Sequence, residues 1–69
     1  MQFTEEALII YPYVSNNQLI YEVDYEDGIR TVTHELPDPI DGEEWTCYGV
    51  DVDPDNHTST VTVATTNVY

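Results

Sequence analysis

Acidic residues recur at every second position in two short stretches of this sequence. Residues 22–27 read EVDYED, and residues 50–55 read VDVDPD. Neither stretch contains a lysine or an arginine. Carboxylates in such a series can pair with basic groups on another molecule, coordinate a metal ion, or act as general acids and bases. Catalysis and metal binding each require further residues, so the rest of the sequence decides between these functions.

Catalysis by paired carboxylates requires two groups in unlike environments, so that their pKa values differ. Every acid in this sequence falls in an expected turn or on an expected exposed strand face. The sequence also has no G-x-S-x-G motif, no phosphate-binding glycine loop and only three glycines in total. We therefore predict that the protein is not an enzyme and needs no cofactor.

The second acidic stretch begins like a calcium-binding loop, with the pattern D-x-D-x-D from Asp51. However, Asn56 stands where such loops have glycine, and Thr62 stands where they have a bidentate glutamate. The two histidines and the single cysteine also lack the spacing of a zinc site. We therefore interpret this stretch as a solvated hairpin turn and predict no bound metal.

Net charge is the most unusual property of the 69-residue chain. Fourteen Asp and Glu residues are balanced by only one arginine, which gives a formal net charge of −13 at pH 7. Such a charge is typical of disordered proteins when hydrophobic residues are scarce, but here 41% of the residues are hydrophobic. We therefore predict one folded acidic domain over residues 1–69, with a small core because short chains bury little surface.

The single Cys47 cannot form an intrachain disulfide, which favours a reducing environment inside a cell. We interpret Cys47 as a small buried hydrophobic residue rather than a reactive thiol. The sequence has no recognisable secretory leader and no apolar run of about 18 residues. These features predict a cytoplasmic protein without membrane association.

Turn-forming residues divide the chain into five runs of about 8 to 10 residues. The turns are expected at SNNQ, EDG, PDPIDG and DPDNH. This spacing predicts an all-β fold, a five-stranded antiparallel meander that forms a small twisted sheet or barrel.

The N-terminal run has two interpretations. Residues 4–7, TEEA, could cap a short helix that ends before Pro12. The following ALIIYPYV is rich in β-branched and aromatic residues, and proline suits an edge strand because it cannot donate to the ladder. We favour the edge strand, followed by a turn at Asn16 and Asn17.

The first acidic stretch lies in a predicted hairpin over residues 19–36. Asp27 and Gly28 suit a two-residue type I′ turn, in which Glu26 pairs with Ile29. The acids then face solvent, because side chains alternate between the two faces of a strand. On the inner face we expect a hydrogen-bonded core histidine and an arginine that contacts a tyrosine ring or an acid. This inner face comprises Leu19, Tyr21, Val23 and Tyr25 with Leu36, His34, Val32 and Arg30.

The second acidic stretch lies in a predicted hairpin that runs from Trp45 to about Val68. Residues 54–57 form its loop, and Asp53 pairs with Thr58. The acids again face solvent in this register. The predicted inner face comprises Tyr48, Val50, Val52, Val63, Val61 and Ser59.

The acidic rows have a spacing similar to that of nucleic-acid phosphates. Side chains at i and i+2 of a strand lie about 6.7 Å apart, and successive phosphates are separated by a distance on the order of 7 Å. In size, charge and acid spacing, the chain resembles small acidic DNA-mimic proteins of phages and mobile elements, which include inhibitors of CRISPR, restriction and uracil-DNA glycosylase enzymes. The resemblance implies an inhibitor of the anti-CRISPR type that occupies a basic nucleic-acid channel.

The implied partner is a basic nucleic-acid-binding protein or complex, such as a CRISPR effector, in the cytoplasm of the host cell if a phage encodes the chain. Direct binding to nucleic acid is not expected, because affinity for phosphates comes from lysine and arginine. The acids predicted to form ion pairs with this partner are Glu22, Asp24, Glu26, Asp27, Asp38, Asp41, Glu43, Glu44, Asp51, Asp53 and Asp55.

A different interpretation requires no partner. An acidic, lysine-free composition is also typical of proteins adapted to a high-salt cytoplasm, where dissolved ions screen the repulsion between carboxylates. In that case the acids should be scattered over all exposed positions. The alternative is therefore a halophile-adapted acidic β module with a structural or protein-binding role.

Both interpretations predict that added salt stabilises the isolated fold. Crowded carboxylates repel one another, and the screening length falls from about 30 Å at 0.01 M salt to about 3 Å at 1 M. We expect the melting temperature in sodium chloride to rise across this range, as measured by circular dichroism. A melting temperature that does not change would contradict the inferred repulsion.

Overall fold

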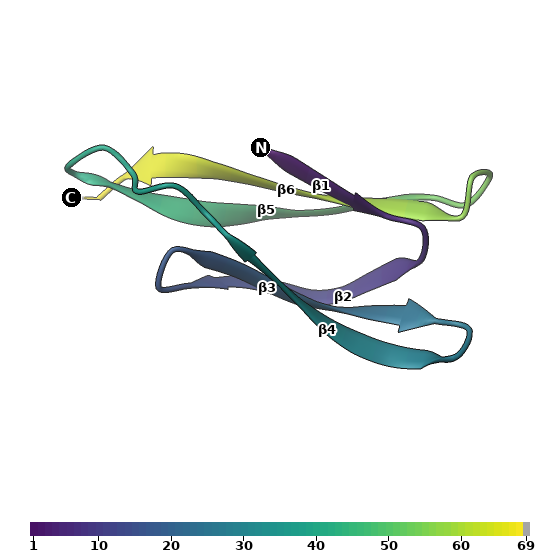
Figure 1. Ribbon diagram of the computed structural model, residues 1–69. Coiled ribbons are helices and arrows are strands. Elements are labelled where there is room, and N and C mark those ends of the chain that lie inside the picture. The colour runs from purple at the N-terminus through teal and green to yellow at the C-terminus, as the bar shows by residue number, and fades with distance from the viewer. Residues whose placement is uncertain (69) are drawn as a thin grey trace.

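The computed structural model describes residues 1–68, which form six β-strands and no helix, and so no helix that could cross a membrane. The strands make two antiparallel three-stranded sheets, ordered β1-β6-β5 and β2-β3-β4, which lie face to face (Figure 1). The all-β prediction is confirmed, but the expected five-stranded meander and the possible helix are wrong. The strands are β1 (Gln2–Glu5), β2 (Leu8–Ser15), β3 (Gln18–Tyr25), β4 (Gly28–Glu35), β5 (Glu43–Asp53) and β6 (Thr58–Asn67).

The N-terminal segment forms two strands, one in each sheet. β1 pairs with the C-terminal strand β6, so that Thr4 lies opposite Thr60. After a corner at residues 6–7, β2 begins in the other sheet as an edge strand, which confirms the predicted edge position. The ladder between β2 and β3 is interrupted around Pro12, where the neighbouring Tyr11 has a positive φ of 50°. An edge strand tolerates this interruption because proline has no N–H to donate.

The β2–β3 and β3–β4 turns differ in how closely they follow the prediction. Asn16 and Asn17 both have positive φ, 52° and 60°, as a type I′ turn requires, and this turn is confirmed. In the next hairpin, Tyr25 pairs with Gly28, so that residues 26–27 form the loop in place of the expected 27–28. The pairing therefore differs by two residues from the prediction. A shift of two residues keeps every side chain on its predicted face.

The β5–β6 hairpin has the predicted pairing of Asp53 with Thr58 at its loop. Further along, the register shifts between Cys47 and Gly49, which makes Tyr48 an extra residue in β5. Tyr48 is 61% exposed, so the prediction that it faces the core is wrong. Cys47 pairs with Val63 instead and packs against the core. A β-bulge of this kind reverses the side-chain alternation beyond it.

The core lies between the two central strands, β3 and β6. Strands at the centre of a sheet are covered by neighbours on both edges as well as by the facing sheet, whereas edge strands are open on one side. Within residues 1–68, all side chains with less than 2% exposure accordingly come from these two strands: Leu19, Tyr21 and Val23 from β3, and Ser59, Val61 and Val63 from β6. 

One buried hydroxyl joins the two sheets near the corner. Ser59 of β6 is 1% exposed, accepts a hydrogen bond from the Ile9 N–H at 3.0 Å and donates one to the carbonyl of Ala7. These two backbone groups belong to the chain as it enters β2 in the opposite sheet. The hydroxyl therefore satisfies polar groups that the ladder of β2 leaves unpaired in the interior.

Replacing Ser59 by alanine should destabilise the protein strongly for so small a change. The substitution leaves a buried N–H and a partly buried carbonyl without partners, and we expect the free energy of unfolding to fall by about 1 to 3 kcal/mol. Urea denaturation measures this loss. Ser15→Ala, at an exposed serine of β2, is the matched control and should change stability by less than about 0.5 kcal/mol. Equal effects would contradict the role of the buried hydroxyl.

Candidate acidic binding surface

The two acidic rows lie on opposite sides of the molecule. Glu22 and Asp24 are exposed on the outward face of the β2-β3-β4 sheet, and Asp51 and Asp53 are exposed on the outward face of the β1-β6-β5 sheet. Because the inner faces of the two sheets pack together, their outward faces point in opposite directions. The rows therefore do not form one continuous surface.

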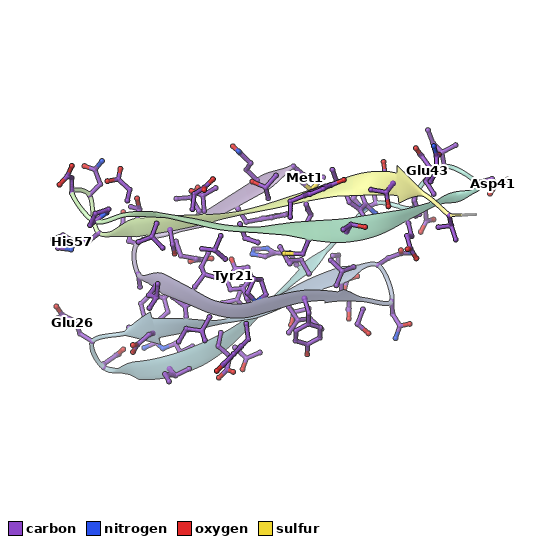
Figure 2. All side chains as sticks on the ribbon, turned by 180° about the vertical axis from the view of Figure 1, so that it is seen from behind. Met1, Tyr21, Glu26, Asp41, Glu43 and His57 are labelled. Carbon is purple, nitrogen blue, oxygen red and sulfur yellow. The ribbon has the colours of Figure 1, made fainter. Side chains whose placement is uncertain are left out.

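The predicted partner-binding acids are also divided between the two ends of the molecule, whose extents are 41 × 21 × 16 Å. Figure 2 shows Glu26 and His57 at one end, here called the turn end, and Asp41 and Glu43 at the other, here called the far end. All of these predicted acids are exposed except Glu43, which is half-buried. The exposure of the set agrees with the sequence, but its division between ends was not foreseen.

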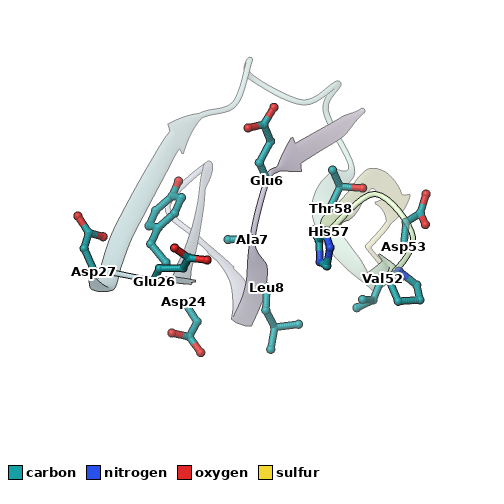
Figure 3. A pocket seen from close by; sticks show the side chains of 12 residues that line it. Glu6, Ala7, Leu8, Asp24, Glu26, Asp27, Val52, Asp53, His57 and Thr58 are labelled. Atoms are coloured by element: carbon teal, nitrogen blue, oxygen red, sulfur yellow. The ribbon is translucent and has the colours of Figure 1, made fainter.

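An open cleft at the turn end is where the two acidic stretches come together (Figure 3). It has a volume of about 710 Å³ and lies between the β3–β4 turn, the β5–β6 loop and the corner at residues 6–7. Its lining includes Asp24, Glu26, Asp27 and Asp53 but not the other predicted partner-binding acids. The remaining lining residues are Glu6, Ala7, Leu8, Tyr25, Val52, Pro54, His57 and Thr58.

A single ion pair is present among residues 1–68. Nη2 of Arg30 lies 2.7 Å from Oδ2 of Asp27, and the guanidinium carbon lies 5.3 Å from the centre of the Tyr25 ring. Both contacts that the sequence led us to expect for Arg30 are therefore confirmed. Both side chains of the ion pair are about two-thirds exposed, 64% and 67%, so the pair adds little to stability. The other carboxylates of the acidic rows form no ion pair with a residue of the described chain.

A second group of titratable side chains lies between the sheets. The Glu5 carboxylate accepts hydrogen bonds from the hydroxyls of Tyr21 and Tyr25, the latter at 3.2 Å. His34 Nε2 lies 2.8 Å from the Tyr21 hydroxyl oxygen, and the His34 ring stacks on Phe3 at 4.2 Å. The predicted hydrogen-bonded core histidine is confirmed. The sequence did not indicate that Glu5 contacts Tyr21, because this hydrogen bond joins β1 to β3 across the sandwich.

Both tyrosines of this group have raised pKa values. For Tyr21, burial and then the hydrogen bond to Glu5 raise the pKa well above its ordinary value of 10.0. For Tyr25, burial and then the negative charge of Glu5 raise the pKa in the same direction. Neutral hydroxyls remain donors to the carboxylate, so the group acts as a polar link between the sheets.

The β5–β6 loop engages one of its own acids. The Asp53 carboxylate accepts hydrogen bonds from the Asn56 side chain at 2.7 Å and from the backbone N–H of Asp55 at 3.1 Å. The Asn56 side chain is the main cause that lowers the pKa of Asp53. This geometry is that of a self-contained turn, as interpreted from the sequence. Within residues 1–68, no three His, Cys, Asp or Glu side chains are grouped closely enough to hold a metal ion.

Comparison with protein-family models, curated protein sequences and solved structures found no match. The functional assignment therefore depends on the geometry and charge of the chain.

The raised tyrosine pKa values predict a loss of stability at alkaline pH. A hydroxyl whose pKa is higher in the folded chain than the ordinary 10.0 contributes stability that is complete below pH 10 and is lost as the pH rises through the raised value. Tyr21→Phe removes this contribution. The difference in free energy of unfolding between the native chain and this variant should therefore shrink above about pH 10.

Urea denaturation at a series of alkaline pH values measures this difference. Tyr13→Phe, at a tyrosine that is 52% exposed, is the matched control. A difference for Tyr21→Phe that stays constant across the series would contradict the buried hydrogen bond to Glu5.

Proposed function

We propose that this protein is a nucleic-acid-mimicking inhibitor of the anti-CRISPR type, which blocks a basic DNA- or RNA-binding channel of a host defence or DNA-processing protein. The observation that carries the proposal is the row of exposed acids at alternate positions on each outward sheet face, with one ion pair among residues 1–68. Carboxylates without cations of their own are available to the arginines and lysines of a partner.

The amount of charge per unit length supports this proposal. Along a 41 Å axis, one strand of a nucleic-acid duplex carries about 12 phosphates, at 3.4 Å per phosphate. The chain carries fourteen Asp and Glu residues. The protein is therefore a rod with about the charge of one nucleic-acid strand of the same length.

The opposite orientation of the acidic rows supports a channel rather than a flat surface as the target. A flat basic surface would reach the row that contains Asp24 or the row that contains Asp51, but not both. A channel or clamp encloses its ligand and contacts both sides. Inhibition then requires no chemical step, because the protein occupies the space and the basic groups that a nucleic acid would use, and long-range attraction steers it there.

A second candidate function is a halophile-adapted acidic β module with a structural or protein-binding role. The observation that favours it is the spread of acids over both outward faces and both ends of the molecule. Charge that serves as an adaptation to salt needs no partner and no particular arrangement. Such a module would unfold below molar salt, and a pull-down with it from a host lysate would recover no nucleic-acid enzyme.

Charge reversal on each face tests the channel. After a partner has been recovered from host lysate at low salt, Asp24→Lys and Asp51→Lys should each weaken its binding by about tenfold or more, because each places a cation against a basic wall. Competition with labelled nucleic acid for the partner measures the effect.

The matched control is Glu35→Lys, at an exposed acid outside the predicted partner-binding set. An effect confined to one face would contradict the channel in favour of a flat surface. Equal effects at all three positions would indicate that the partner responds only to the net charge of the protein and not to the acidic rows.

A further inference from the structure

The cleft at the turn end has an apolar floor. Ala7 and Leu8 lie on one side of it, and Val52 lies on the other (Figure 3); Pro54 also belongs to the lining. Leu8 is 47% exposed and Val52 is 56% exposed. These exposed side chains form an apolar groove at the surface.

Three acids at the rim of this groove have no partner among the described residues. Asp27 is paired with Arg30, and Asp53 accepts hydrogen bonds from its own loop. Asp24, Glu26 and Glu6 have neither an ion pair nor a side-chain hydrogen bond. 

Two of these acids border the apolar floor directly. Asp24 lies opposite Leu8 in the β2–β3 ladder, and Figure 3 shows the Glu26 carboxylate directed toward the corner at Ala7. Negative charge and exposed hydrophobic surface therefore lie side by side.

A guanidinium already contacts two residues of the cleft lining. The guanidinium of Arg30 pairs with Asp27 and lies over the ring of Tyr25, and both of these residues belong to the lining. A guanidinium is planar and can bond two carboxylate oxygens at once, whereas an ammonium is a compact and strongly hydrated charge. The alkyl stem of an arginine also covers apolar surface while its head remains with the acids.

We propose that the cleft receives an arginine side chain of the basic partner protein, with its guanidinium between Asp24 and Glu26 and its stem against Leu8 and Val52. The inference rests on the proposed function for the source of this arginine. It identifies the turn end, where the row that contains Asp24 reaches the cleft, as the part of the protein that recognises a particular side chain, whereas the other acids of the outward faces supply charge.

A titration with N-acetyl-L-arginine amide tests the cleft without any partner. In ¹⁵N-correlated NMR spectra, the amide signals of Ala7, Leu8 and Val52 should move, while those of residues 38–44 at the far end should not. N-acetyl-L-lysine amide at the same ionic strength should cause smaller shifts. Equal shifts with the lysine compound, or shifts spread evenly over the chain, would overturn the proposal.

Paired substitutions separate the site from general charge. Asp24→Asn combined with Glu26→Gln should weaken arginine-amide binding about fivefold, whereas Asp38→Asn combined with Asp41→Asn makes the same charge change at the far end and should not. Equal weakening by both pairs would overturn the proposal.

The apolar floor has its own pair of variants. Val52→Thr keeps the size and branching of the side chain and should weaken binding, whereas Ile40→Thr, at a residue that is 76% exposed outside the cleft, should not. An unchanged affinity in Val52→Thr would overturn the packing of the stem.

A failure of the arginine site can be distinguished from a failure of the proposed function. Arginine amide that binds in the cleft of a protein with no nucleic-acid-binding partner would reject the proposed function alone. A partner that binds the Val52→Thr variant with full affinity, yet binds Asp24→Lys and Asp51→Lys weakly, would reject the arginine site alone.

Discussion

The structure depends on the shared burial of β3 and β6, the central strands of the two sheets. Within residues 1–68, their side chains account for all positions with less than 2% exposure, and the hydrophobic ones among them form a core cluster with Ile9 and Leu36. Strand side chains alternate between faces, so hydrophobic residues that point inward oblige their neighbours to point outward. A slip of one residue would bury carboxylates, which is far more costly than leaving them exposed. 

This arrangement determines how the protein presents its charge. Each sheet buries one face and turns an acidic face to solvent, so a net charge of −13 is spread around a narrow rod. Repulsion between the acids opposes folding, and the small core must offset it. The same distribution is what allows a basic channel to contact the protein on more than one side.

The interior is not purely hydrophobic, and its polar contacts join segments that the ladders do not. Ser59 connects β6 to the chain that enters β2, and Glu5 connects β1 to Tyr21 of β3. Both links hold the corner at residues 6–7, where the chain passes from one sheet to the other. The cleft lies beside this corner, where the hairpin tips end and the two sheets no longer cover each other's hydrophobic residues.

Local patterns in the sequence were sufficient for the strands and their faces. The alternation in YEVDYED, residues 21–27, placed Tyr21, Val23 and Tyr25 inward. The Asn16-Asn17 pair marked a turn, and the pairing of Asp53 with Thr58 followed from its loop. These features depend only on residues that are close together in the sequence, so local patterns were enough to predict them. 

Only the tertiary structure decided how the strands combine. The pairing of β1 with β6, the contact between Glu5 and Tyr21, and the bulge that turns Tyr48 outward join residues that are distant in the chain or depend on the opposing strand. The sequence by itself determined that the acids of the two acidic rows face solvent, because side chains alternate along a strand and the hydrophobic neighbours of these acids point to the core. The packing of two sheets decided that the rows face opposite ways and meet only at one cleft, since that depends on which strand faces which across the core.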